Sequence, residues 1–303
     1  MSCKNFLAHS RQFIFKRHKV KKVFPKLLVS ALAAVTLAAC STNPSTSANA
    51  SAESTVTLTP AQVSGQFLVA ATAWVQNAGE YRALSYQAFN YATLAFDNAK
   101  AVKGKAKAVV VDLDETMIDN AAYQGGVAKY GIPFSSQTWG KWEREGNPKV
   151  SPGALEFAKY VTSKGGKVFY VSNRRAENWD ATQATLKALG FPEVTKETLL
   201  LKDKESNKNA RFAQAGQNYN VVLYVGDNLQ DFPDTYKIRD NAGRIDWVDA
   251  NRKNFGVKYI VLPNPMYGSW ISTLVPDFYK NSLSGQNQII LDAIKAWDLS
   301  NFK

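Results

Sequence analysis

The residues most suited to chemistry are Asp112 and Asp114, two aspartates spaced one apart directly after an apolar run. Residues 109–111 are all valine, which is typical of a strand buried on both faces of a parallel sheet. Side chains alternate along an extended chain, so both carboxylates are expected to face one side. Two close carboxylates need a metal ion or a proton as compensation when they are buried. The pattern therefore predicts a chemical site at the carboxyl end of this strand.

Residues 1–39 have the character of an export signal rather than of a folded segment. They contain no acidic residue, eight basic ones and a final apolar run at 27–39 that is too short to span a bilayer. The basic residues are Lys4, Arg11, Lys16, Arg17, Lys19, Lys21, Lys22 and Lys26. Without these eight cations the formal net charge of +12 falls to about +4. The basicity therefore does not indicate a nucleic-acid polymer as partner.

The apolar run ends in Leu-Ala-Ala-Cys at 37–40, which resembles a bacterial lipobox. Cleavage there would leave Cys40 as a lipid-modified N-terminus, whereas an ordinary secretory signal would make this cysteine incidental. Residues 40–59 are rich in Ser, Thr, Ala and Asn and are predicted to be a flexible tether. Cys40 is followed by Ser41 and Thr42, with no aspartate at the second position, which in the usual sorting of such lipoproteins favours the outer membrane.

The expected mature chain contains neither histidine nor a free cysteine. His9, His18 and Cys3 lie in the leader, and Cys40 is the predicted lipid site. Ser-His-Asp hydrolysis, cysteine or histidine nucleophiles and zinc sites built on His or Cys are therefore excluded. Carboxylate, hydroxyl and Lys/Arg chemistry remains, together with hard metal ions such as Mg²⁺ that prefer oxygen ligands.

The remaining chain, 60–303, alternates predicted strands with predicted helices, which indicates an α/β fold with a doubly wound parallel sheet. The predicted strands end at residues 111, 172, 201, 225 and 262, and helices are predicted from Pro60, between Ser151 and Gly165, at 178–189, at 209–215 and through Ile290, Ile294 and Trp297. The first helical stretch is expected either to continue past Gly79 or to break there. Its apolar stripe is expected to pack on the core, with a homodimer contact as the alternative.

An aromatic-rich insertion follows the first strand. Residues 120–146 contain Tyr123, Tyr130, Phe134, Trp139 and Trp142 among several glycines. Any one of these rings is most simply explained by core packing, but as a group beside a carboxylate site they would form a cap that stacks a planar substrate. The cap elements are predicted at about 60–104 and 120–148.

Four predicted strand ends thus carry polar groups: Asp112-x-Asp114-x-Thr116, then Ser172, then a lysine, and then Gly-Asp-Asn-Leu-Gln-Asp at 226–231. The series resembles the haloacid-dehalogenase (HAD) superfamily of phosphotransferases. More narrowly, it resembles the bacterial lipoprotein class C acid phosphatases, also called outer-membrane lipoprotein 5′-nucleotidases. The stretches that carry the resemblance are 109–120, 168–174, 223–232, 264–270 and the lipobox.

The resemblance implies a role for each aspartate. Asp112 is expected to attack phosphorus and form an aspartyl-phosphate, and Asp114 to protonate the leaving oxygen and then activate water. A general acid starts protonated, so hydrolysis is expected to favour mildly acidic pH. Mg²⁺ is expected to be held by Asp112, the backbone carbonyl of Asp114 and Asp227, with Asp231 contributing through water.

The phosphate is expected to contact a hydroxyl and an ammonium group. Ser172 is predicted to hold a non-bridging phosphate oxygen, and Lys208 to offset the charge of the transferring phosphoryl group. Lys208 precedes Asp227 at the start of a predicted helix, and Lys202, directly after a short strand, is the alternative.

Substrate choice is assigned to aromatic residues by the same resemblance. Tyr123, Trp139 and Tyr267 fall where the family sandwiches a base, at about 1–3 kcal/mol per stacked ring. The implied substrates are nucleoside 5′-monophosphates, nicotinamide mononucleotide and aromatic phosphate esters. Dehalogenase chemistry on the same fold needs neither Asp114 nor a metal, so these acidic residues argue against it. The alternative from another class is a non-catalytic surface lipoprotein that binds nucleotides or another ligand.

Overall fold

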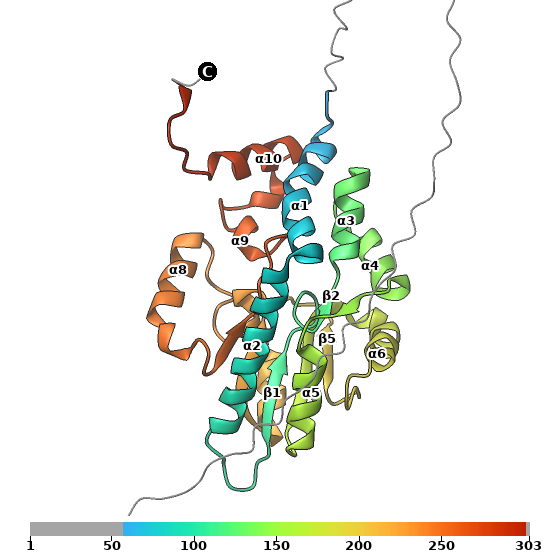
Figure 1. Cartoon of the computed structure of the whole chain (residues 1–303), viewed down its shortest axis with the longest axis vertical. Helices are drawn as coiled ribbons and strands as arrows, with labels where there is room; N and C mark the ends of the chain where they lie inside the picture. Colours follow the sequence, from blue (N-terminus) through green and yellow to red (C-terminus); the bar gives the residue numbers. More distant parts are fainter. Residues whose placement is uncertain (1–56, 301–303) are drawn as a thin grey trace, which may run out of the picture. The chain divides into compact units, whose positions relative to one another are not determined.

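The computed structural model describes residues 57–300, drawn in colour in Figure 1. The predicted signal at 1–39, the lipid site at Cys40 and nearly all of the tether lie outside these residues. Within 57–300, none of the helices combines the length and the apolar character that a membrane span needs.

A five-stranded parallel sheet lies at the centre of the described part, with strand order β5-β4-β1-β6-β7. The strands are β1 (Lys107–Val111), β4 (Lys167–Arg175), β5 (Leu199–Lys202), β6 (Asn220–Gly226) and β7 (Tyr259–Val261). Val110 lies opposite Phe169 of β4 on one side and Tyr224 of β6 on the other, which places β1 in the middle. The predicted α/β fold with a parallel sheet is confirmed.

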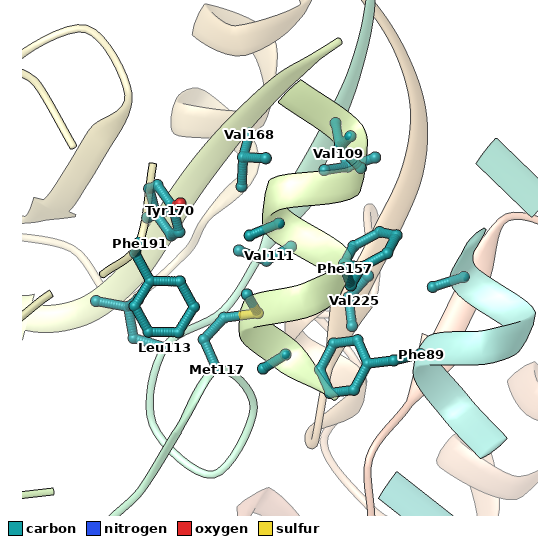
Figure 2. Packing of buried hydrophobic residues seen from close by; sticks show 14 of the residues in the cluster. Phe89, Val109, Val111, Leu113, Met117, Phe157, Val168, Tyr170, Phe191 and Val225 are labelled. Atoms are coloured by element: carbon teal, nitrogen blue, oxygen red, sulfur yellow. The ribbon is translucent and has the colours of Figure 1, made fainter. Parts of the chain in front are cut away.

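Helices cover both faces of this sheet. On one face α2 (Gly79–Asn98), α5 (Ala154–Ser163) and α6 (Trp179–Ala188) pack on β1 and β4, and on the other lies α7 (Asn209–Asn218). Figure 2 shows Val109 and Val111 among the rings of Phe89 and Phe157, all fully or nearly fully buried. Val110 instead packs with Phe212 of α7. Each such buried side chain contributes about 1.5–3 kcal/mol, which explains why β1 is apolar on both faces.

The first helical stretch consists of two helices, as one of the two sequence interpretations had it. Helix α1 (Pro60–Asn77) begins after Thr59, whose hydroxyl accepts from the Gln62 N–H while the Gln62 side chain accepts from the Thr59 N–H. The chain is extended at Ala78, and α2 follows directly. Helix α1 packs on α3 (Ala121–Tyr130) and α10 (Leu283–Asp292).

The aromatic insertion contains the two helices α3 and α4 (Ser136–Glu145). A two-stranded antiparallel ribbon encloses it: β2 (Ile118–Asp119) precedes α3 and pairs with β3 (Lys149–Val150), which follows α4. Figure 1 shows α3 and α4 beyond the loop that leaves β1. The insertion is thus attached to the chain that carries Asp112 and Asp114.

The C-terminal helix is shorter than predicted. Helix α10 ends at Asp292, and Ile294 and Trp297 lie beyond it with exposed fractions of 64% and 76%. Asn287, inside the helix, is buried and bonded to Ser64 of α1. Residues after Asp292 bury too little surface to extend the helix, because helices gain most of their stability from tertiary packing.

Several short elements have no strong periodic pattern and were not predicted. They are α8 (Asn241–Ala250), α9 (Ser269–Ser272) and the 3₁₀ helices η1 (Ala176–Asn178), η2 (Leu229–Asp231), η3 (Arg252–Asn254) and η4 (Phe278–Lys280).

Candidate active site

The site lies where the strand order reverses. Strand β1 pairs with β4 on one side and with β6 on the other, and the carboxyl ends of such strands flank a ligand crevice. The Asp112 N–H donates to Val225 O at 2.9 Å, so the first aspartate still belongs to the sheet ladder. Asp227 follows directly on β6. Sheet pairing alone therefore brings Asp112 and Asp227 together.

A tight loop after β1 orients the two predicted catalytic aspartates. The carbonyl of Leu113 accepts from the N–H groups of Thr116, Met117 and Ile118 at 3.2, 2.8 and 2.9 Å. Glu115 has a φ of 59°, in the left-handed region that costs a non-glycine residue about 1 kcal/mol. The turn is therefore held by its own hydrogen bonds against a local strain.

Three carboxylates that are buried or half-buried face one another in the crevice. Ligand oxygens of Asp112, Asp227 and Asp231 all lie within 4.8 Å of one another, an arrangement that could hold a metal ion. Burial raises the pKa of Asp112 well above its ordinary value; the ammonium of Lys208 opposes that shift and Asp231 adds to it. Burial and then the charge of Asp231 raise the pKa of Asp227 to about 7. This cluster is electrostatically incomplete without cations.

Neighbouring side chains fix the orientation of the cluster. The Asp227 carboxylate accepts from Thr116 Oγ1 at 3.1 Å and from Asn264 Nδ2 at 2.9 Å. Asp231 accepts from the Asn228 N–H at 2.9 Å. A Cβ at Gly226 would overlap the Asp231 side chain, so the glycine before Asp227 allows the close approach of these two acids.

Lys208 is the cation that contacts the cluster. Its ammonium donates to Asp112 and, at 2.7 Å, to Asp231, and its side chain is only 3% exposed. The residue directly precedes α7. Lys202, the alternative in the sequence analysis, is half-buried at the end of β5. The structure thus places Lys208 against the carboxylates.

Replacing Lys208 with methionine is expected to destabilise the protein by about 3–5 kcal/mol near pH 8, because it leaves buried carboxylates without their partner. Carboxylates whose pKa is raised on folding destabilise the fold as pH rises through that pKa, here about 7 for Asp227. The loss is therefore expected to shrink below neutral pH and to be partly recovered by a divalent cation. Thermal unfolding at several pH values measures it.

Lys202→Met is the matched control, since it removes the same charge from a half-buried position. It is expected to change stability by less than about 0.5 kcal/mol. Equal destabilisation by the two substitutions, or a Lys208→Met loss that does not grow with pH, would contradict the role given to Lys208.

Asp114 lies beside this cluster and has a different set of partners. Its Oδ1 accepts from Arg174 Nη2 at 2.8 Å, Arg174 Nε at 2.9 Å and Asn120 Nδ2 at 2.9 Å. Ser172 Oγ donates to Oδ2 at 3.3 Å and accepts from the Arg174 N–H at 3.1 Å. The predicted phosphate-binding Ser172 therefore lies at the carboxylate of Asp114.

Sequence reasoning missed Arg174, Asn120 and Glu115. Asn120 is fully buried, and its N–H donates to Glu115 Oε1 at 3.0 Å. Burial raises the pKa of Glu115 well above its ordinary value, and Asp114 adds to that shift. An arginine and an asparagine following strands and turns are too common to stand out; the position of Arg174 two residues after Ser172 was the available signal.

The predicted substrate-binding aromatics lie in two groups, and all three are half-buried. Tyr123 and Trp139 meet edge to face with ring centroids 5.0 Å apart, and the Tyr123 hydroxyl bonds Thr138 Oγ1 at 2.8 Å. Tyr267 packs instead with the cluster that contains Val75, and its N–H donates to Asn264 Oδ1 at 3.5 Å. Tyr123 and Trp139 thus form one wall, and Tyr267 lies beside the support of Asp227.

Comparison with known proteins agrees with this geometry. The sequence profile of the HAD superfamily, subfamily IIIB (acid phosphatase), matches residues 26–270. The class C acid phosphatase of Bacillus anthracis is similar in structure, with a TM-score of 0.74 and 36% identity over 78% of this chain and 100% of that chain. Its tungstate-bound form gives a TM-score of 0.73 at the same identity and coverage.

Plant proteins are also similar over part of the chain. The stem 28 kDa glycoprotein of Glycine max is 31% identical over 132 residues, which are 40% of this chain and 51% of the relative. A stem 31 kDa glycoprotein of Glycine max is 31% identical over 132 residues, 40% of this chain and 44% of the relative. The chain thus spans about half the length of these curated relatives.

Proposed function

The chain belongs to the HAD-superfamily acid phosphatases of subfamily IIIB, and from that membership we propose that it is a Mg²⁺-dependent acid phosphomonoesterase. One observation carries the proposal: Asp112, Asp227 and Asp231 converge at one end of the sheet, with Lys208 among them and Asp114 beside them. Within residues 57–300, these three carboxylates are the one group of acidic residues placed to hold a metal ion, which phosphoryl transfer commonly uses.

The proposed reaction begins with Asp112. One of its carboxylate oxygens attacks phosphorus, and the ester P–O bond breaks as the new bond forms. The Asp114 carboxyl gives its proton to the leaving oxygen and then, as a carboxylate, takes a proton from the water that cleaves the aspartyl-phosphate. Lys208 and Ser172 hold the phosphoryl oxygens. An acid that starts protonated favours mildly acidic pH.

The donor set fits a hard divalent ion. Asp112, Asp227 and Asp231 offer only oxygen atoms, and burial, followed by the charge of neighbouring aspartates, raises the pKa values of Asp112 and Asp227. We propose that Mg²⁺ is held by Asp112, Asp227 and the Asp114 carbonyl, with Asp231 contributing through water. When bound, it supplies positive charge that offsets the negative charge of the transferring phosphoryl group.

The proposed substrates are nucleoside 5′-monophosphates, nicotinamide mononucleotide and aromatic phosphate esters. The support is the wall formed by Tyr123 and Trp139, together with Tyr267 beside Asn264. Half-buried rings offer faces on which a planar leaving group stacks.

The proposed location is the outer membrane, with the lipid on Cys40 as anchor and residues 40–59 as tether. This proposal rests on the basic and apolar leader and on its lipobox-like end. A homodimer through the N-terminal helices is part of the same proposal, since Leu84, Tyr91 and Leu94 of α2 are exposed.

Turnover of p-nitrophenyl phosphate with and without EDTA tests the proposed function. We expect that EDTA abolishes turnover and that added Mg²⁺ restores it. Rates are expected to be higher at mildly acidic than at alkaline pH. Nucleoside 5′-monophosphates are expected to compete. Turnover that is unaffected by chelation would remove the metal role, and an absence of turnover at every pH would favour the non-catalytic binding protein.

A further inference from the structure

We propose that Arg174 is a positioning residue for the general acid: it holds Asp114 by one oxygen so that the other presents the proton to the leaving group. The inference rests on the proposed function, because it assigns a partner to Asp114 in that reaction. It adds to the site a residue that hydrogen-bonds Asp114 rather than the three carboxylates of the acidic cluster.

The deep burial of Arg174 shows that its contact with Asp114 is not an incidental surface contact. Its side chain is 1% exposed at the end of β4, the largest fully buried side chain in the described part of the chain. A guanidinium in such a place is costly unless it is paired and hydrogen-bonded. Asp114 meets that need with two bonds to Oδ1 and a longer one, at 3.2 Å, from Nε to Oδ2.

Asn120 fixes the same oxygen from the other side. Its Oδ1 accepts from Trp142 Nε1 at 2.8 Å and from Arg174 Nη2 at 3.3 Å, so its Nδ2 must face Asp114. That nitrogen donates to Asp114 Oδ1 at 2.9 Å. Glu115 accepts from the Asn120 N–H at 3.0 Å and so holds the backbone from which this amide extends. Three N–H donors therefore converge on one oxygen of Asp114.

This convergence gives the two carboxylate oxygens of Asp114 different roles. Oδ1 is saturated with donors, whereas Oδ2 has only the longer contacts with Arg174 Nε at 3.2 Å and Ser172 Oγ at 3.3 Å. Oδ2 is thus the oxygen that carries the proton when Asp114 acts as the acid. As the bond from Asp112 to phosphorus forms and the ester bond breaks, that proton passes from Oδ2 to the leaving oxygen.

The anchors of Asp114 also belong to the aromatic insertion. Trp142 of α4 bonds Asn120 directly, and the Arg174 guanidinium lies 5.9 Å from the ring centroid of Trp139. The side chains that orient the acid therefore pack against the wall proposed to contact the substrate ring. A substrate ring bound against this wall would therefore restrict the motion of Arg174, the residue that orients Asp114.

The test compares esters whose leaving groups differ in their need for a proton. The measured quantity is kcat/KM, which reports only on the reaction steps up to and including departure of the leaving group. Arg174→Lys keeps the positive charge but loses the paired N–H donors of the guanidinium. Its kcat/KM for an alkyl ester such as a nucleoside 5′-monophosphate is expected to fall on the order of 10²-fold. Its loss on p-nitrophenyl phosphate, which leaves without a proton, is expected to be below about 10-fold.

Arg175→Lys is the matched control, because the neighbouring Arg175 is exposed and its side chain pairs, within residues 57–300, only with Glu177. It is expected to keep the wild-type ratio of the two kcat/KM values. Trp142→Phe serves if Arg174→Lys does not fold: it keeps an aromatic ring but removes the donor to Asn120, and it is expected to lose a few-fold on the alkyl ester alone.

The outcomes separate the two proposals. Wild-type protein that hydrolyses both esters, with variants that lose equally on both, would overturn the positioning role and leave the proposed function intact. Unchanged ratios in folded Arg174→Lys would do the same. Wild-type protein that hydrolyses neither ester would overturn the function itself.

Discussion

Asp112→Asn is expected to reduce turnover of p-nitrophenyl phosphate by on the order of 10⁴-fold or more, because the amide cannot attack phosphorus. The protein is expected to stay folded. Burial raises the pKa of Asp112 well above its ordinary value, so the fold disfavours the charged form that the amide replaces. Lys208 keeps its second partner, Asp231. Steady-state kinetics and thermal unfolding measure the two expectations.

Asp97→Asn is a suitable control, since Asp97 accepts hydrogen bonds from the Tyr160 hydroxyl at the surface. It is expected to keep wild-type turnover. Substantial turnover by Asp112→Asn would remove Asp112 as nucleophile, and unfolding of that variant would contradict the electrostatic account of the cluster.

Asp114→Asn is expected to lower turnover by about 10²–10⁴-fold, because the proton donor and the later base are both lost. Mg²⁺ affinity is expected to remain, since only the backbone carbonyl of Asp114 is proposed to bind the ion. The variant should also unfold at lower temperature, because the buried guanidinium of Arg174 loses its counter-charge. Calorimetric Mg²⁺ titration and thermal unfolding follow these quantities.

The two asparagine variants therefore differ in a way that activity alone does not reveal. Asp112→Asn relieves a crowded cluster, whereas Asp114→Asn breaks a pair with Arg174. If Asp114→Asn lost its Mg²⁺ affinity, the proposal that Asp114 binds the ion only through its backbone carbonyl would be wrong. If its thermal stability were unchanged, the pairing with Arg174 would contribute little.

The sheet was predictable because its strands are short apolar runs that end in polar residues. Val109 to Val111 must be buried on both faces, and parallel strands present their carboxyl ends at one edge. That rule alone predicts that Asp112 and Asp227 lie close together. The capped start of α1 was equally local, since Thr59, Pro60 and Gln62 form it among themselves.

The remainder depends on contacts between distant segments. Arg174 and Asp114 are sixty positions apart, and only its position two residues after Ser172 distinguishes Arg174 from the exposed Arg175 that follows. The β2–β3 ribbon pairs only two residues of each strand, too few for an alternating pattern. The end of α10 was misjudged because Trp297 continues the apolar stripe without being buried.

The most direct test of the account is the location of the phosphoryl group during turnover. Protein quenched with acid during hydrolysis of a phosphate ester is then reduced with tritiated borohydride, which releases the phosphate and converts the phosphorylated carboxyl group to an alcohol. After digestion, the tritium label is expected on the peptide that contains Asp112. Wild-type protein should show it and Asp112→Asn should not. A covalent label on any other residue, or none in protein that turns over at full rate, would contradict the central claim.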